Sequence, residues 1–294
     1  MKNSVIFVVG PTAVGKSAYA IGMALELDGE IVSADSMQVY KGLDLGTAKP
    51  TQEERQGIRH HMIDICDPIC DYSAAEFSTA AQSAISDIFW RGKQPIVCGG
   101  SGLYIHSLLY DLDFSGRAGD ERLREQLTRE AEEKGAECLF EKLLEIDPAA
   151  ADHVHPNNVK RVIRALERAY GDLENGGLRA FSSTFETRLR YDSRIIRLTA
   201  DRKKLYAKID ARTEGFFKQG LAAEVRRLLA DGVPRDSNAM QGIGYKEVAA
   251  MIDGNIDEKE TLSLVQQNTR RYAKRQETWF KRYVDAEILC VKDL

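Results

Sequence analysis

Short apolar runs alternate with helical patterns at the beginning and toward the end of the chain. Continuous runs rich in β-branched residues are typical of strands buried on both faces. Five stretches have this pattern: residues 4–9, 30–34, 95–98, 195–198 and 288–291. Helical patterns separate most of them, one beginning at a capping box of Ser73 and Glu76. Strands that alternate with helices predict an α/β fold in which helices cover both faces of a parallel sheet.

The middle of the chain has a different pattern. Residues 116–194 contain a highly charged helical stretch over residues 120–134 and a basic helical stretch farther along. Strand-like runs flank this block on both sides. We therefore expect a mostly helical insertion domain over residues 116–194, within a core formed by residues 1–115 and 195–294.

Composition narrows the class of protein. The chain has 294 residues, of which 43% are hydrophobic and 29% charged, as in soluble globular proteins. The sequence contains no apolar run of the ~18 residues that a membrane helix needs. The first apolar run has no small-residue cleavage site after it, which favours a strand over a signal peptide. Five widely spaced cysteines favour a reduced, cytoplasmic protein.

Charge is distributed unevenly along the chain. The net charge is −4, but residues 1–115 carry 8 basic and 14 acidic residues and residues 116–294 carry 33 and 31. Arg271, Lys274 and Arg275 share one predicted helical face, and the insertion has a second basic face at Lys160, Arg161, Arg164 and Arg168. Such faces are often only solvated surface, but they also suit nucleic-acid phosphates.

The most specific motif is a phosphate-binding loop of the form G-x-x-x-x-G-K-[ST], placed between a predicted strand and a predicted helix. Its residues are Gly10, Pro11, Thr12, Ala13, Val14, Gly15, Lys16 and Ser17. Glycines let backbone N–H groups surround phosphate oxygens, and the helix N-terminus adds its dipole. Lys16 supplies positive charge, and the Ser17 hydroxyl is a candidate Mg²⁺ ligand. The loop predicts that a diphosphate or triphosphate binds, without specifying the reaction.

Two further features follow predicted strands, as the phosphate-binding loop does, and so are expected beside that loop. Asp35 follows the second predicted strand, where a carboxylate can act as general base, bind Mg²⁺ or cap a turn. Ser101 lies in the glycine turn 99–104, which either faces the ligand crevice or only connects a strand to a helix. We reject a zinc site at His60, His61, Cys66 and Cys70, because the cysteine spacing lacks a second ligand pair and adjacent strand residues point to opposite faces.

These motifs, with several others, closely resemble the bacterial tRNA dimethylallyltransferases, or IPP transferases. The matching stretches are Gly10–Ser17, Asp35–Gly42, Gly46–Pro50, His60-His61 with Asp64, Gly99–Tyr104, Arg161–Arg164, Gln241–Glu247, and Arg271–Gln276 with Thr278 and Trp279. They follow the family order over nearly the whole chain. Ser101 replaces a threonine that many relatives have, and Cys66 and Cys70 also depart from the family pattern.

The resemblance implies an enzyme that transfers a dimethylallyl group from its diphosphate to N6 of the tRNA adenine on the 3′ side of the anticodon. It implies a nucleotide-kinase-like core and an insertion that grips the anticodon stem. The P-loop, of the type that also binds ATP, would hold the prenyl diphosphate, with Mg²⁺ as cofactor and Ser17 as its protein ligand. We expect no membrane association and no obligate protein partner.

The resemblance also assigns roles to individual residues. It gives catalysis to Asp35, as general base, and to Lys16, Ser101 and Arg212. Together with the basic pattern, it predicts tRNA contacts at Asp35, Ser36, Met37, Gln38, Ser101, Lys160, Arg161, Val162, Ile163, Arg164, Gln241, Gly242, Ile243, Gly244, Tyr245, Lys246, Arg271, Lys274 and Arg275.

Three other functions remain to be weighed. An isopentenyltransferase for free adenine nucleotides would not need the two basic faces. A small-molecule kinase should consume ATP and lack the Asp35–Gln38 stretch. A non-catalytic RNA-binding module would not need Lys16, Ser17 and Asp35 together.

Overall fold

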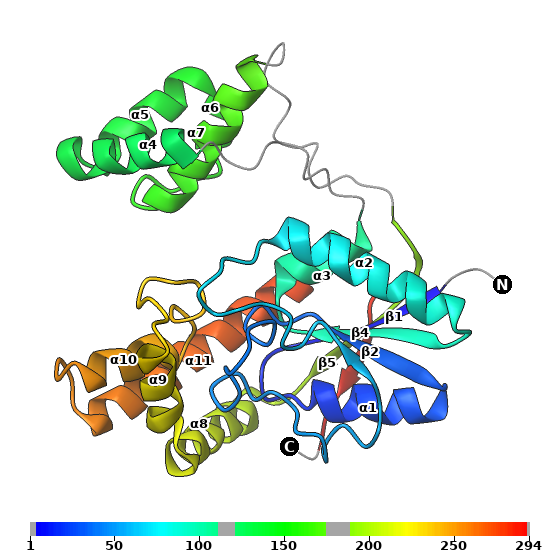
Figure 1. Ribbon diagram of the computed structural model, residues 1–294. Helices are drawn as coiled ribbons and strands as arrows, with labels where there is room; N and C mark the ends of the chain where they lie inside the picture. The colour runs from blue at the N-terminus through cyan, green and yellow to red at the C-terminus, as the bar shows by residue number, and fades with distance from the viewer. Residues whose placement is uncertain (1–3, 111–120, 175–188, 293–294) are drawn as a thin grey trace. The chain divides into compact units, whose positions relative to one another are not determined.

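The computed structural model describes residues 4–110, 121–174 and 189–292 (Figure 1). The chain forms two compact units, one of Met1–Leu109 with Leu189–Leu294 and one of Tyr110–Arg188. Sequence analysis placed the borders after residues 115 and 194, the first of which lies outside the described residues. The second border differs because strand β5 (Asp192–Thr199) begins with three polar residues, which its apolar pattern does not reveal.

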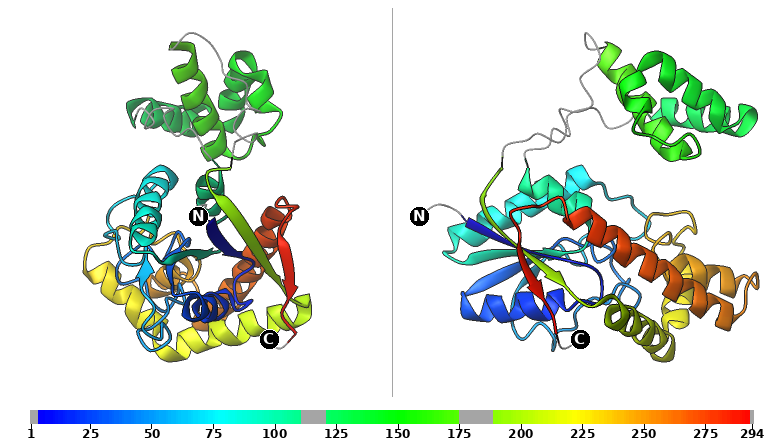
Figure 2. Two further views of the ribbon diagram at one scale, coloured as in Figure 1. Left: turned by 90° about the vertical axis from the view of Figure 1, so that its right-hand side faces the viewer. Right: turned by 180° about the vertical axis from the view of Figure 1, so that it is seen from behind.

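A parallel sheet forms the centre of the larger unit. Its strands are β1 (Ser4–Val9), β2 (Gly29–Ser33), β3 (His60–His61), β4 (Gln94–Gly99), β5 and β6 (Glu287–Cys290), in the order β3-β2-β4-β1-β5-β6. Neighbouring strands of this sheet pair in parallel, as predicted. Figure 2 shows β6 beside β5 at one edge of the sheet. Only β3 among these strands was not predicted, because its two residues are too few to show a pattern.

Helices cover both faces of this sheet (Figure 1). The helices of the larger unit are α1 (Lys16–Glu26), α2 (Ala74–Trp90), α3 (Gly102–Leu109), α8 (Arg202–Gln219), α9 (Leu221–Ala230), α10 (Tyr245–Ile252) and α11 (Glu258–Phe280). Alternate strand residues such as Ile6 and Val8 pack with Ile21 of α1 and Ile209 of α8 in one core cluster. Apolar burial of alternate side chains thus fixes the layered arrangement.

Sequence predicted the start of α2 closely. The Ser73 hydroxyl accepts a hydrogen bond from the Glu76 N–H, and the Glu76 carboxylate accepts one from the Ser73 N–H. These bonds satisfy backbone donors that the first turn of a helix otherwise leaves unpaired.

The smaller unit is helical in its described part. It contains α4 (Glu121–Lys134), α5 (Ala136–Ile146), α6 (Pro148–Ala151) and α7 (Val159–Glu174). These helices share an apolar core with Leu139, Leu143, Val162 and Leu166 fully buried. A mostly helical insertion is therefore confirmed for the described residues. No helix in the described ranges has the length and apolar character required to cross a bilayer.

Candidate active site

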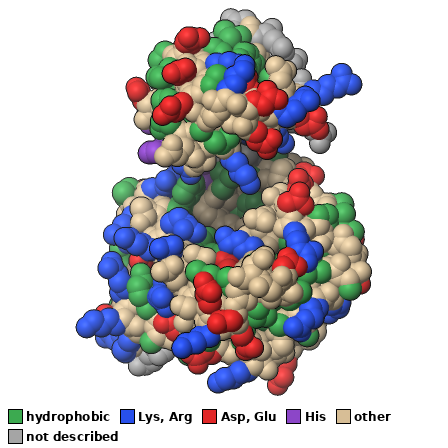
Figure 3. Space-filling view, turned by 90° about the vertical axis from the view of Figure 1, so that its left-hand side faces the viewer, with side chains coloured by type: hydrophobic (Ala, Val, Ile, Leu, Met, Phe, Trp, Pro, Cys, Tyr) green, Lys and Arg blue, Asp and Glu red, His purple; other side chains and the backbone are tan. Residues whose placement is uncertain are grey.

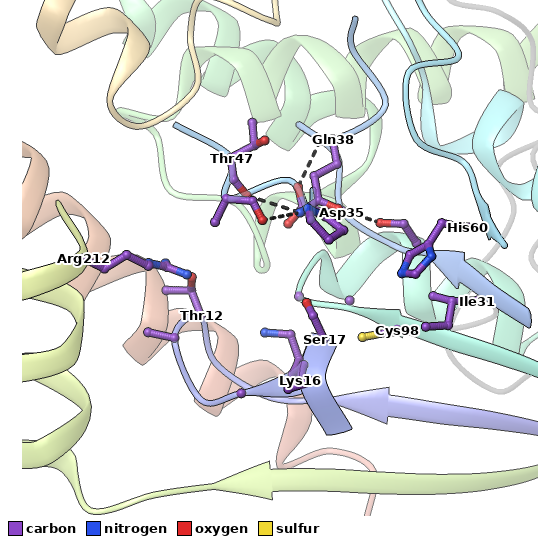
Figure 4. A pocket seen from close by; sticks show the side chains of 18 of the residues that line it. Thr12, Lys16, Ser17, Ile31, Asp35, Gln38, Thr47, His60, Cys98 and Arg212 are labelled. Atoms are coloured by element: carbon purple, nitrogen blue, oxygen red, sulfur yellow. Dashed lines mark hydrogen bonds between the residues drawn. The ribbon is translucent and has the colours of Figure 1, made fainter. Parts of the chain in front are cut away.

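The parallel register brings the two glycine turns together at the carboxyl ends of strands β1 and β4, which form one edge of the sheet. Val9, just before the phosphate-binding loop, pairs with Gly99, the first glycine of the second turn. Beside this edge is a cavity of about 210 Å³ (Figure 4). It is lined by Thr12, Ala13, Gly15, Lys16, Ser17, Ala18, Ile31, Ser33, Asp35, Gln38, Thr47, Ala48, Pro50, His60, Cys98, Gly99, Gly100, Lys208 and Arg212.

The phosphate-binding loop turns sharply into α1. Gly15 precedes the helix with φ +95°, a left-handed conformation that glycine adopts without steric cost. Five of the eight residues predicted to bind phosphate, Thr12, Ala13, Gly15, Lys16 and Ser17, line the cavity. The remaining three residues of the motif, Gly10, Pro11 and Val14, are buried. They shape the loop and do not present side chains to a ligand.

Cations dominate the loop side of the cavity. Lys16, Lys208 and Arg212 all line it, and Lys16 donates a hydrogen bond to the Pro11 carbonyl at 2.8 Å. Burial lowers the pKa of Lys16 to about 8, although Cys98 and Asp35 act in the opposite direction. Desolvated positive charge of this kind favours the binding of an anion.

Arg212 lies on α8 and is held against the loop. Its guanidinium donates to the Thr12 hydroxyl at 2.6 Å and stacks over the Phe216 ring at 5.6 Å. Burial lowers the pKa of Arg212, and Asp35 partly offsets this. The resemblance gives this arginine a catalytic role, and the structure brings it to the phosphate-binding loop from 200 residues away in the chain.

Asp35 is the one carboxylate among the described residues that line the cavity. It follows β2, and its Oδ1 accepts hydrogen bonds from the N–H groups of Met37 at 2.9 Å and Gln38 at 3.4 Å. The side chain therefore caps a turn and also borders the cavity, opposite the loop cations (Figure 4). The turn-capping role is thus observed, while the general-base and Mg²⁺-binding roles of this cavity-lining carboxylate stay predictions.

Ser101 supports the turn that contains Asp35. Its hydroxyl accepts a hydrogen bond from the Ser36 N–H at 2.8 Å and donates one to the Ser36 hydroxyl at 3.1 Å. The side chain is buried and is not among the residues that line the cavity. These contacts tie the second glycine turn to the Asp35 turn.

Gln38 lines the cavity, but its amide is engaged within the protein. Its nitrogen donates to the carbonyls of Thr47 and Ala48, and its oxygen accepts from the Ser33 hydroxyl at 3.0 Å. A tRNA contact through this amide, as the resemblance implies, would compete with these bonds. As observed, Gln38 fixes the loop over residues 44–50.

Two further contacts anchor the same loop. The Glu224 carboxylate accepts hydrogen bonds from the N–H groups of Asp44 and Leu45 and from the hydroxyl of Tyr245, the last at 2.6 Å. A Cβ on Gly46 would lie 2.5 Å from the Tyr245 ring, so only glycine fits there. Tyr245, predicted to contact tRNA, is buried and holds this loop instead.

The other predicted tRNA residues divide in the same way. In the stretch from Gln241 to Lys246, those two residues are exposed, Ile243 is half-buried, and Gly242 and Gly244 are buried. Of the predicted tRNA residues in α7, Lys160, Arg161 and Arg164 are exposed, and Arg164 pairs with Glu167 at 3.4 Å. Val162 and Ile163 lie in the core of the insertion, so their side chains are unavailable to a ligand.

The basic face of α11 is accessible at its three predicted positions. Arg271, Lys274 and Arg275 are all exposed. Figure 3 shows one face of the molecule, on which the larger unit exposes many Lys and Arg side chains together with acidic ones. Arg270, by contrast, forms an ion pair with Asp210 of α8. The basic residues of α11 therefore differ by position: Arg270 forms an ion pair inside the protein, and the three exposed residues are available to a polyanion.

The histidine pair has the opposite orientations that the strand geometry predicts. His61 lies 2.7 Å from Glu30, which also binds Arg91. The hydrogen bonds from Arg91 and, to a lesser extent, from His61 lower the pKa of Glu30 to about 2. His60 borders the cavity and its ring nitrogen lies 2.9 Å from the Ile58 carbonyl. His61 therefore belongs to an ion-pair network and His60 to the cavity wall.

Sequence analysis assigned no site role to several polar side chains, among them Lys208 and Thr47 in the cavity wall and Gln276 beside it. Gln276 of α11 is buried, and its amide contacts both the Thr12 N–H and the Gly100 carbonyl. The available signal was its place in a helical stripe with Ala273 and Phe280, both buried. A glutamine in an otherwise apolar stripe predicts a buried hydrogen-bonding partner.

Comparisons with known proteins agree with this geometry. A sequence profile of the IPP transferase family matches residues 38–283. A tRNA dimethylallyltransferase of Exiguobacterium is 50% identical over 285 residues, covering 97% of this chain and 89% of the relative. Its counterpart from Alkaliphilus metalliredigens is 46% identical over 287 residues, covering 98% and 91%.

Solved structures are also similar. The full-length tRNA isopentenylpyrophosphate transferase of Bacillus halodurans has a TM-score of 0.73 and 38% identity, covering 100% of this chain and 91% of that one. A eukaryotic dimethylallyltransferase acting on tRNA has a TM-score of 0.82 and 29% identity, covering 98% and 73%. These matches extend over the core and the insertion together.

Proposed function

Because the chain belongs to the IPP transferase family, we infer that it is a tRNA dimethylallyltransferase. It transfers a dimethylallyl group from dimethylallyl diphosphate to the N6-amino group of the adenine on the 3′ side of the anticodon, and releases diphosphate. The observation that carries this inference is a cavity in which Lys16 and Arg212 oppose the carboxylate of Asp35. A tRNA substrate suits an enzyme of the cytoplasm.

The cations account for departure of the leaving group. Breaking the bond between the allylic carbon and the ester oxygen places negative charge on diphosphate. Lys16 and Arg212 are fixed before the reaction by Pro11 and Thr12, so they stabilise this charge without reorganising. Arg212 offers a planar fork that fits phosphate oxygens.

The cavity lining includes oxygen groups that suit Mg²⁺. The Ser17 hydroxyl and the Asp35 carboxylate are hard oxygen donors, the kind that Mg²⁺ prefers, and both line the cavity. We propose that Ser17 holds the ion on the donor's phosphates, where it would neutralise part of their charge.

Asp35 accounts for activation of the acceptor. The lone pair of an adenine amine is delocalised into the ring, which makes the amine a weak nucleophile. Asp35 orients the amine and takes its proton as nitrogen bonds to the allylic carbon. The adenine must leave the anticodon-loop stack to reach the cavity, so the reaction requires base flipping.

Exposed cations account for recognition of the RNA. Arg271, Lys274 and Arg275 of α11 present unburied charge on the same unit as the cavity. Lys160 and Arg161 of α7 present a second basic surface on the insertion, which we propose grips the anticodon stem. Contacts of this kind position the nucleic acid without reading its sequence.

A substrate-exchange assay tests the function. The enzyme is incubated with radiolabelled dimethylallyl diphosphate and Mg²⁺, together with total tRNA, with AMP or with ATP. We expect label in tRNA and none in the nucleotides. Label in AMP or ATP would support the free-nucleotide transferase, and ATP hydrolysis without prenyl transfer would support a kinase. A competition experiment with unlabelled ATP measures whether the phosphate-binding loop also accepts that nucleotide.

A further inference from the structure

Gln276 bridges the two loops that form the donor side of the cavity. Its Oε1 accepts a hydrogen bond from the Thr12 N–H at 2.8 Å, and its Nε2 donates one to the Gly100 carbonyl at 2.9 Å. The side chain is only 4% exposed, so water does not replace these bonds readily. Both hydrogen-bonding ends of one amide are therefore used to join two separate turns.

The surroundings leave little freedom to this amide. A Cβ on Gly100 would overlap the Gln276 amide nitrogen, so glycine is required for the helix to approach. The hydroxyl of Thr12 accepts from Arg212. A hydrogen-bonded line thus runs from Gly100 through Gln276 and Thr12 to Arg212, across the side of the cavity that holds the cations.

The same helix also carries the exposed basic face. Arg275 immediately precedes Gln276, and Arg271 and Lys274 lie within the preceding turn and a half of α11. Gln276, the residue after Arg275, is hydrogen-bonded to Thr12 of the phosphate-binding loop. The exposed basic residues and the residue that contacts the loop therefore belong to one helix, and a shift of that helix moves both.

We propose that Gln276 is a positioning residue that couples tRNA binding on α11 to the geometry of the phosphate-binding loop, an inference that rests on the proposed function. It holds Thr12, and through it Arg212, in the arrangement that receives the diphosphate. Binding of tRNA to the basic face stabilises this arrangement, and so tightens donor binding. Coupling of this kind is reciprocal and typically amounts to a roughly 5- to 150-fold change in affinity.

Two variants and one matched control test the proposal. Gln276→Met keeps the length of the side chain and removes both hydrogen bonds. Gln276→Glu keeps the acceptor for Thr12 but cannot donate to Gly100. The control is Gln266→Met, because Gln266 is on the same helix and donates instead to the Asp210 carbonyl of α8.

The measurements are the Kd of dimethylallyl diphosphate with and without unmodified tRNA, the Kd of tRNA alone, and the single-turnover rate. In the natural enzyme, tRNA should lower the donor Kd at least ~5-fold. Gln276→Met should reduce this effect below about 2-fold and slow the single-turnover rate, while tRNA alone binds normally. Gln276→Glu should show the same loss of coupling, and Gln266→Met should behave like the natural enzyme.

Several outcomes overturn the proposal. One is a donor Kd in the natural enzyme that does not depend on tRNA. Another is coupling that persists in Gln276→Met or in Gln276→Glu. If Gln276→Met does not fold, Gln276→Glu decides the question. Absence of prenyl transfer by the natural enzyme would instead overturn the proposed function, so the two failures are distinguishable.

Discussion

The cavity and the exposed basic face of α11 use positive charge in opposite ways. Lys16 and Arg212 are bound by neighbours inside a cavity, and burial lowers the pKa of both. Lys274 and Arg275 project from α11 into solvent. The first arrangement provides strong, fixed stabilisation of a small anion. The second provides weak, adaptable and salt-dependent contacts suited to a long polyanion.

The largest expected effect concerns the carboxylate that faces the buried cations. Asp35→Asn retains an oxygen for the Met37 and Gln38 N–H groups but cannot accept a proton. It should slow single-turnover transfer by roughly 10²–10⁴-fold, with donor and tRNA affinities changed only a few fold. A parallel measurement of donor Kd at two Mg²⁺ concentrations separates the roles. Weak donor binding that extra Mg²⁺ restores would make Asp35 a metal ligand, and an unimpaired rate would refute the base role.

Removal of a buried cation should have the second-largest effect on activity. Lys16→Ala removes a charge that acts most strongly as diphosphate departs, so kcat/KM should fall at least ~10²-fold. Steady-state kinetics over a range of donor concentrations measure this. Lys203→Ala is the control, because Lys203 is exposed in the first turn of α8 and should have ordinary kinetics. Similar reductions in both variants would contradict a special role for burial.

Removal of exposed cations should affect RNA binding alone. Simultaneous change of Arg271, Lys274 and Arg275 to alanine should weaken tRNA binding roughly 10²-fold at physiological salt. The slope of log K against log salt should fall by about one unit for each phosphate that the variant no longer neutralises. Donor titrations should give a nearly normal Kd. A salt slope like that of the natural enzyme would reassign this face to solvated surface, and Arg202→Ala with Lys203→Ala provides the matched comparison.

A smaller effect should follow from the lowered pKa of Lys16. The free enzyme loses the Lys16 proton as pH rises through about 8. Donor Kd measured without tRNA should therefore rise about tenfold between pH ~7 and pH ~9, whereas Lys16→Met should show no such rise. Stability changes in the other direction. Between about pH 8 and the ordinary value of 10.5, the unfolded chain binds more protons, so this group adds to the free energy of unfolding as pH rises.

The smallest effect on activity is expected where a predicted RNA contact is a loop anchor. Tyr245→Phe removes one hydrogen bond to Glu224, whose carboxylate keeps the N–H groups of Asp44 and Leu45. Loss of such a buried bond costs about 2 kcal/mol, so thermal unfolding should begin several degrees lower, and affinity for tRNA should change less than about 3-fold. A large loss of RNA affinity in a stable variant would restore Tyr245 as an RNA contact.

Sequence predicted the parts of the fold whose signals are local. The apolar runs that became β1, β2, β4, β5 and β6 were evident because buried parallel strands are apolar throughout. The phosphate-binding loop was evident because its glycines and Lys16 are close together in the chain. The two residues of β3 were not, because their strand conformation depends on pairing with β2.

Individual side-chain roles were harder to predict within a matching stretch. Adjacent positions of a helix face different directions, so the stretch from Arg161 to Arg164 contains two exposed arginines and the buried Val162 and Ile163. The two contacts of Gln276 bridge 264 and 176 positions of sequence. Such partners become visible only when the fold has brought α11 to the glycine turns.

The base of the insertion has a consequence for the history of this architecture. The Arg190 N–H donates to the Leu109 carbonyl at 2.9 Å, so the two chain ends at which Tyr110–Arg188 enters and leaves the larger unit touch one another. The larger unit therefore holds the two ends of this segment together, as it would hold the two ends of a surface loop. Loop-closure entropy grows only with the logarithm of length. A change in the length of this segment therefore has little effect on the folding free energy of the larger unit. The insertion can diverge toward a different nucleic acid while the cavity keeps its structure.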